Sequence, residues 1–217
     1  MARNRLSRQR LISAALELID AEGPEKLTAR KLASSLGASP MALYWHFDNK
    51  AQLLEGVGDY LVSLITPPVS LDQQGQKNPA DWEETLTAVL HSVIDVVQQH
   101  PRAADLVVQR LLFTAPGQQL AEQALRALEQ AGLDEATAVV VARHGLRVAT
   151  TVGTERLFTG SPNSDNPGQE EPREVSFDQS VQPALAASSD WLHRATPPEL
   201  YRETAVNLFI AGVRALS

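Results

Sequence analysis

The sequence predicts an all-α protein in which a three-helix unit is followed by a larger helical domain. Apolar residues recur at three- and four-residue steps along most of the 217 residues, which is the spacing of amphipathic helices. No segment alternates polar and apolar residues for long enough to propose a strand. Capping residues, glycines and prolines separate the helical stretches, so each helix has a recognisable beginning and end.

Two helices are predicted near the start of the chain. An amphipathic helix over residues 7 to about 22 is stopped by Gly23 and Pro24. Thr28 is a favourable N-cap for the second helix, whose apolar face lies within residues 32–36. The first two helices are therefore separated by a short connection.

A third and a fourth helix follow a glycine turn. Gly37 supplies the positive φ that a tight helix exit needs. Ser39 caps the third helix, and Asp48 or Asn49 caps a fourth that covers residues 50–65. A second and a third helix joined by such a turn form a helix-turn-helix module, a motif that binds DNA.

The predicted third helix, "SPMALYWHF" over residues 39–47, begins with small residues and ends with rings. Small side chains at its start can lie against base edges in the major groove. Amphipathic rings at its end can reach phosphates while they pack on the module. The alternative for Tyr44 and Trp45 is that they are core rings.

Charge is distributed unevenly along the chain. Residues 1–50 hold eight Lys and Arg against five Asp and Glu, a net charge of +3. The total is −7, so the remaining residues carry −10. A basic beginning on an acidic body indicates that the first 50 residues bind a polyanion, although chance scatter in a short window is the alternative.

The segment "LTARKLASSLGASPMALYWHFDNKAQLL", residues 27–54, resembles the DNA-binding signature of the TetR family of bacterial transcriptional repressors. Its pattern is most similar to tetracycline repressor-like members. The preceding "RLISAALELIDAEG" is similar to the first helix of that family. Together these stretches cover about the first quarter of the chain. The resemblance implies a homodimer that binds a palindromic double-stranded DNA operator and is released by a small-molecule effector.

The resemblance also implies roles for individual residues. Thr28 and Lys50, at helix N-termini, would bind phosphates, and Arg30 would reach a base. Tyr44 and His46 would contact the sugar–phosphate backbone. The expected DNA-contacting residues are Thr28, Arg30, Ser39, Met41, Ala42, Tyr44, Trp45, His46 and Lys50.

The expected domain organisation has two parts. Residues 1–50 form the DNA-binding domain, and the fourth helix, 50–65, connects it to the rest. Residues 66–217 form a domain for effector binding and dimerisation. Within it, residues 160–176 are rich in Pro, Ser, Asn and acidic residues and are expected to be a flexible loop.

A long helix predicted from Asp134 to about Thr159 carries a stripe of small residues, and the last helix carries a similar one. Two glycines inside one helix suggest close approach by another helix. In TetR-like proteins the corresponding helices pair with their symmetry mates. The expected dimer interface is Ala142, Gly145, Ala149, Gly153, Ala205, Leu208, Phe209 and Gly212. The alternative is that these small residues pack within one subunit.

A partly polar stripe lies beside the small-residue stripe on the same predicted helix. With apolar walls from neighbouring helices it could line a ligand pocket. The residues expected there are Leu86, Leu90, Leu111, Phe113, Val140, His144, Arg147 and Thr151. Structural roles for the histidine and the arginine are the alternative.

Other classes of function find little support in the sequence. No nucleophile elbow, P-loop or dinucleotide fingerprint is present, so no enzyme and no cofactor are expected. His91 and Asp95 have a metal-compatible spacing that is common by chance, and no metal site is expected. The absence of cysteine, export signal and apolar span predicts a cytoplasmic protein that does not enter membranes. A DNA-binding regulator without an effector, or an enzyme with a helical pocket, remains an alternative.

Overall fold

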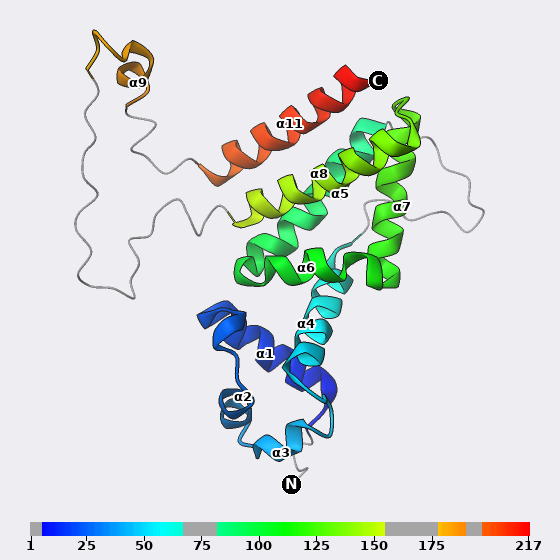
Figure 1. Ribbon diagram of the computed structural model, residues 1–217, viewed down its shortest axis with the longest axis vertical. Helices are drawn as coiled ribbons and strands as arrows, with labels where there is room; N and C mark the ends of the chain where they lie inside the picture. Colours follow the sequence, from blue (N-terminus) through cyan, green and yellow to red (C-terminus); the bar gives the residue numbers. More distant parts are fainter. Residues whose placement is uncertain (1–5, 67–81, 155–177, 190–196) are drawn as a thin grey trace.

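The computed structural model describes residues 6–66, 82–154, 178–189 and 197–217, and this part of the chain is helical without any strand (Figure 1). The α-helices are α1 (Arg8–Glu22), α2 (Ala29–Ser35), α3 (Pro40–Leu43), α4 (Lys50–Leu64), α5 (Trp82–Gln99), α6 (Ala104–Arg110), α7 (Ala115–Gln130), α8 (Glu135–Thr154), α9 (Pro183–Ala187) and α11 (Pro198–Leu216). Three short 3₁₀ helices are η1 (Pro24–Lys26), η2 (Pro101–Ala103) and η3 (Leu111–Phe113). The predicted all-α class is confirmed.

The helices form a small head and a larger body. Helices α1, α2 and α3 make the head at one end of the molecule, and α4 runs from the head into the body (Figure 1). Helix α4 packs against α1 on the head side and against α6 on the body side. Fully buried Leu11 and Leu32 in the head and Ile94 and Leu128 in the body belong to one continuous hydrophobic core. The head is thus supported by the body through α4.

Side-chain caps fix the helix starts in the head. The hydroxyl of Thr28 accepts from the backbone N–H of Lys31 at 3.2 Å, and the hydroxyl of Ser39 accepts from that of Ala42 at 3.3 Å. The side chain of Asn49 caps α4 by accepting from the backbone N–H of Gln52. These caps confirm the predicted helix starts, because each satisfies a backbone donor that has no partner within its helix. Gly37 has a φ of +62°, the positive value expected for the turn.

The third helix is shorter than predicted. Helix α3 ends at Leu43, and residues 44–46 form a turn instead of a continuing helix. Backbone N–H groups of His46 and Phe47 both donate to the carbonyl of Leu43, at 2.9 and 3.1 Å. The turn buries Phe47 beside Leu43, each with 5% of its surface exposed. The predicted inward side chains are therefore correct, although the helix stops early.

Two contacts join the head to the body outside the core. Nδ1 of His100 lies 2.8 Å from Oδ2 of Asp20, and the guanidinium of Arg102 donates to the carbonyl of Ala21. We call these four residues the junction. They connect the end of α1 to η2, between α5 and α6. A further ion pair between Arg110 and Asp59, at 2.7 Å, holds α6 to α4.

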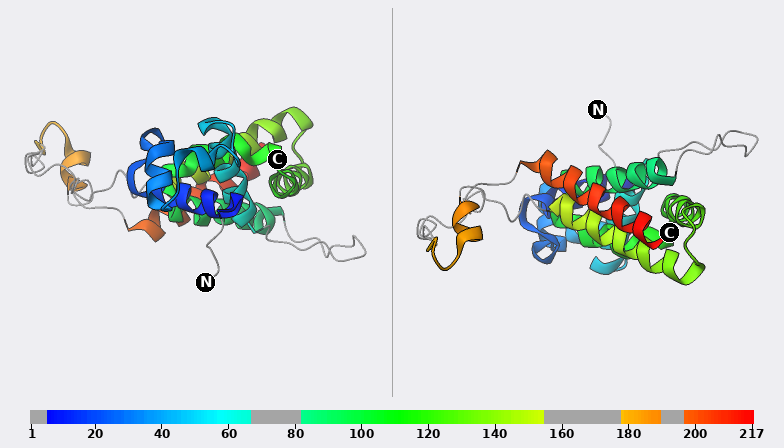
Figure 2. Two further views of the ribbon diagram at one scale, coloured as in Figure 1. Left: turned by 90° about the horizontal axis from the view of Figure 1, so that it is seen from below. Right: turned by 90° about the horizontal axis from the view of Figure 1, so that it is seen from above.

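The body is built around α5. This helix packs against α7, α8 and α11, and its buried residues include Leu86, Leu90 and Val97. Helix α11 lies alongside α8, as the right-hand view of Figure 2 shows. The predicted loop 160–176 and the last residues of the predicted long helix lie outside the described residues. None of the described helices is both long and apolar enough to cross a membrane.

Candidate functional site

The turn after α3 presents large rings to solvent. Trp45 is 86% exposed and Tyr44 is 53% exposed, while Leu43 and Phe47 on either side are buried. Met41 on α3 is also exposed, at 71%. Burial of large apolar side chains stabilises a fold, so a cluster of them in solvent indicates a surface that binds a partner. Tyr44 and Trp45 are thus available to a partner, and the alternative of core rings is wrong.

The other expected DNA-contacting residues lie in the same head. Thr28, Arg30 and Ser39 are exposed, and Ala42 and His46 are half-buried. The cap bond uses the oxygen of Thr28 as an acceptor, which leaves its O–H free to donate to a phosphate. Helices α2 and α3 lie at the end of the molecule that is farthest from α11 (Figure 1). Eight of the nine expected residues therefore lie in the head, and Lys50 begins α4 where that helix leaves the head.

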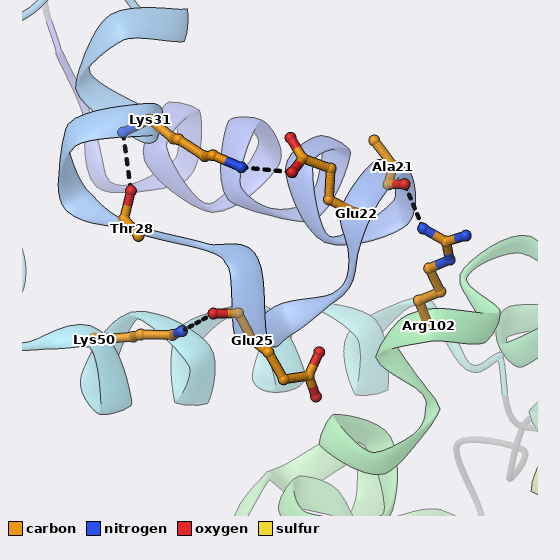
Figure 3. Close-up of polar contacts among 7 residues, drawn as sticks. All are labelled: Ala21, Glu22, Glu25, Thr28, Lys31, Lys50 and Arg102. Carbon is orange, nitrogen blue, oxygen red and sulfur yellow. Dashed lines mark hydrogen bonds and ion pairs between the residues drawn. The ribbon is translucent and has the colours of Figure 1, made fainter. Parts of the chain in front are cut away.

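Two lysines in the head have different surroundings (Figure 3). Nζ of Lys31 lies 2.5 Å from the carboxylate of Glu22, and this hydrogen bond lowers the pKa of Glu22. Nζ of Lys50 instead donates to the backbone carbonyl of Glu25 at 3.1 Å. A carbonyl does not neutralise the ammonium charge, so Lys50 keeps its charge available for an anion whereas Lys31 is paired.

Arg8 also contributes to this site, although from the sequence it is recognised only as part of the basic charge of residues 1–50. Its guanidinium lies 4.5 Å from the centre of the Phe47 ring and donates to the carbonyl of His46 at 3.4 Å. It therefore holds the first turn of α1 against the turn that carries Trp45. Only the basic composition of the N-terminus hinted at a role for it, because this contact spans 38 residues.

The body contains a cavity of about 420 Å³ between α5, α7 and α8. Leu86, Leu90 and Leu111, three of the expected ligand-binding residues, line it. Phe113 does not line it; its ring is 72% exposed and lies 5.1 Å from the guanidinium of Arg110. A volume of this size is within the range of small-molecule sites.

A second, larger hollow of about 710 Å³ lies between α8 and α11, and we call it the α8–α11 groove. The other four expected ligand-binding residues line this groove and not the cavity: Val140, His144, Arg147 and Thr151. Four expected dimer residues line it from the opposite side: Ala205, Leu208, Phe209 and Gly212. The groove is rich in exposed apolar surface, since Val140 and Leu208 are each more than 60% exposed.

The small-residue stripe of α8 faces the interior of the subunit, which corrects the prediction that it meets a partner. Ala142, Gly145 and Ala149 line the internal cavity. A methyl group on Gly145 would lie 2.9 Å from Cζ of Phe209, and one on Gly153 would lie 2.6 Å from Cβ of Val97. The close approach that these glycines allow is therefore made by α5 and α11 of the same chain.

His91 and Asp95 are engaged with α11. The carboxylate of Asp95 lies 2.6 Å from the guanidinium of Arg202, and Nε2 of His91 lies 3.9 Å from Glu203. Burial lowers the pKa of His91, and the charge of Arg202 lowers it further. Within the described ranges no three His, Asp or Glu residues gather into a group that could hold a metal ion.

Comparison with family models identifies both parts of the chain. The model "Bacterial regulatory proteins, tetR family" matches residues 11–57. The model "Tetracyclin repressor-like, C-terminal domain" matches residues 74–216. The first match contains the helix-turn-helix and the first half of α4, and the second contains the cavity and the α8–α11 groove.

Individual relatives agree with these matches. An HTH-type transcriptional regulator of Saccharopolyspora erythraea is 31% identical over 131 residues, which are 60% of this chain and 52% of that protein. The tetracycline repressor protein class C of Escherichia coli is 44% identical over 61 residues, 28% of each chain. The chain thus matches about half of the length of the first relative and about a quarter of the second.

The fold is shared with a solved structure, that of the Streptomyces coelicolor TetR family protein ActR in complex with actinorhodin. The TM-score is 0.73, and the likeness covers 97% of this chain and 98% of that chain. The two sequences are 22% identical, so the likeness concerns the fold.

Proposed function

The chain belongs to the TetR family of transcriptional regulators, whose members are not enzymes, and from this premise we propose that it is a repressor. It occupies a palindromic operator as a homodimer and is released when a small molecule binds the body. Residues 1–50 contact DNA, the fourth helix connects, and residues 66–217 bind the effector and the second subunit. The observation that carries the proposal is the turn after α3, which exposes Tyr44 and Trp45 beside a buried Phe47.

Sequence recognition in this proposal depends on few side chains. Arg30 is the strong base-edge donor of the module, and its fork fits guanine. Met41 and Ala42, at the start of the recognition helix, touch thymine methyl groups. Contacts with the sugar–phosphate backbone of the DNA position the module without reading bases. They are made by Lys50, Thr28, Tyr44 and His46.

The homodimer is proposed to form through the α8–α11 groove. Leu208, at 68% exposure, and Leu216, at 60%, lie on α11 beside exposed Val140 on α8. This side of the molecule is visible in the right-hand view of Figure 2, where the two helices run side by side. A two-fold axis through this face would pair two heads, as a palindromic site requires.

Effector binding is proposed for the internal cavity. It lies between α5, α7 and α8, and α5 leads through η2 to the junction with the head. The solved structure of ActR in complex with actinorhodin supports a small-molecule site in a protein of this fold. A ligand that favours one placement of the two heads would then lower the affinity for the operator.

Selection of bound fragments from random double-stranded DNA tests the proposal. We expect an inverted repeat with one guanine per half-site that Arg30 reads. Arg30→Ala should remove the preference at that symmetric position, at a cost of about 1–3 kcal/mol per half-site, and leave other positions unchanged. Uracil in place of the flanking thymines should weaken wild-type binding through lost methyl contacts. Selection of fragments without any repeat would contradict the proposed operator.

The second candidate function is a DNA-binding regulator that no small molecule controls. The two functions differ in whether a small molecule dissociates the protein from its operator. A small molecule that binds the full-length protein and dissociates it from the selected operator supports an effector. If no ligand of the cavity changes operator binding, the result supports the regulator without an effector.

A further inference from the structure

The cavity between α5, α7 and α8 is lined almost entirely by hydrocarbon. Leucine, valine and alanine side chains from the three helices and from the α6–η3 region make most of its wall. Phe209 of α11 contributes the one aromatic ring among the lining residues that the structure describes. Backbone groups of the surrounding helices are committed to helical hydrogen bonds. The wall therefore offers a bound molecule dispersion contacts and few hydrogen bonds.

Arg143 of α8 is the exception in this wall. Of the described residues that line the cavity, it alone has a polar side chain. It is also exposed, so it stands where the cavity meets solvent. No described residue forms an ion pair or a hydrogen bond with its side chain, in contrast to Arg110, Arg202 and Arg214 of the same body. Its guanidinium is thus available to an incoming anion.

This arrangement limits the chemistry of a ligand. A ligand with hydroxyl groups or a positive charge along its length would leave polar groups buried without partners, which is unfavourable. An aliphatic ligand loses only its contact with water when it enters the cavity. Each buried methylene of the ligand raises its affinity about fourfold. A guanidinium pairs with anions that accept two parallel hydrogen bonds, which are carboxylates and phosphates. Of the two, a carboxylate carries the smaller charge, so bringing it to the edge of an apolar cavity costs less.

We propose that the cavity binds an aliphatic carboxylic acid, with its hydrocarbon chain among the leucines and its carboxylate on Arg143. The inference rests on the proposed function, because it assigns the effector class of the same site. The hydrocarbon chain of the ligand would lie among uncharged side chains of the wall. The carboxylate would stay at the edge of the cavity, in partial contact with water. The site thereby combines apolar affinity with selection for an anion.

The test uses the full-length protein and straight-chain acids from hexanoate to tetradecanoate, each below its micelle concentration. Affinity, measured by isothermal titration calorimetry, should rise about fourfold per methylene and level off once the chain fills the cavity. Decanol and decylamine should bind at least about tenfold more weakly than decanoate, because neither pairs its head group with a guanidinium. Equal affinity of decanol and decanoate would overturn the proposal, as would tighter binding of decyl phosphate, which would assign the site to phosphate esters.

Variants separate the two parts of the site. Arg143→Leu should abolish the preference for decanoate over decanol, and Arg143→Lys should keep part of it. Arg126→Leu is the matched control, because Arg126 is an exposed arginine of α7 that pairs with Glu122 and does not line the cavity. Ala124→Phe should fill the cavity and abolish binding of acid and alcohol alike, with circular dichroism to verify the fold. An Arg143→Leu protein that keeps the preference would refute the role of Arg143.

Release from DNA is measured separately, by fluorescence anisotropy of a labelled operator. Release by decanoate that Arg143→Leu weakens supports both the ligand class and the effector function. Tight, Arg143-dependent binding that leaves the operator bound supports the ligand class and contradicts the effector function. Failure of every chain length to bind overturns the ligand class, whereas operator binding itself is unaffected by that result.

Discussion

Nδ1 of His100 lies 2.8 Å from Oδ2 of Asp20, although the two residues are eighty positions apart in the sequence. The contact joins the end of α1 in the head to η2 in the body. Both side chains are less than one third exposed, so the interaction is partly shielded from solvent. It fixes the head relative to the body at a second place, in addition to the packing of α1 on α4.

His100→Ala should therefore weaken operator binding, because a loosened head must be ordered again on the DNA. A double-mutant cycle with Asp20→Ala measures the effect, and we expect a coupling energy of roughly 0.5–3 kcal/mol in operator binding. Gln99→Ala, an exposed neighbour, is the control. Additive effects of the two substitutions would show that the contact does not matter for DNA binding.

Lys50→Ala should weaken binding to all DNA sequences alike. Its ammonium group rests on a carbonyl and keeps its charge, whereas Lys31 is paired with Glu22. The slope of log affinity against log salt concentration should fall by about one per subunit. Lys31→Ala is the matched control and should leave the slope unchanged. The same slope in the Lys50→Ala protein and the wild type would exclude the phosphate contact.

Leu208→Arg should produce monomers that remain folded. The side chain is exposed in the α8–α11 groove, so a charge there costs the subunit little and opposes a partner. Gly153→Leu is the contrasting variant. It collides with Val97 in the same subunit and should lower the free energy of unfolding by about 1–3 kcal/mol or more. Sedimentation and thermal unfolding distinguish the two effects, and an intact Leu208→Arg dimer at micromolar concentration would place the interface elsewhere.

Stability should fall as the pH is lowered through the range in which His91 titrates. Burial lowers the pKa of His91 in the folded protein below its usual value of 6.5. Below pH 6.5 the unfolded chain therefore takes up a proton before the folded one, which favours unfolding until the lowered pKa is passed. Urea unfolding from pH 8 to pH 5 at constant protein concentration should show a smaller decline for His91→Gln. Equal declines in the two proteins would assign the pH dependence to other groups.

Local signals in the sequence predict where the helices of the head begin, although α3 ends earlier than predicted. Thr28, Ser39 and Asn49 cap their helices as predicted, because a cap depends on a side chain and a backbone N–H only three residues apart. The inward positions of Leu43 and Phe47 follow from their spacing in the same way. Local interactions of this kind are fully encoded within a few residues of sequence.

The side of α8 that faces inward depends on the packing of the whole subunit and not on local sequence. Its two adjacent stripes are both compatible with burial, and residues one position apart, such as His144 and Gly145, point about 100° away from each other on a helix. The packing of α5 and α11 selected the small-residue stripe for the interior, because Val97 and Phe209 need the space that glycine leaves. The contact of Arg8 with Phe47 and that of His100 with Asp20 likewise depend on chain segments far apart in the sequence, which no local pattern relates.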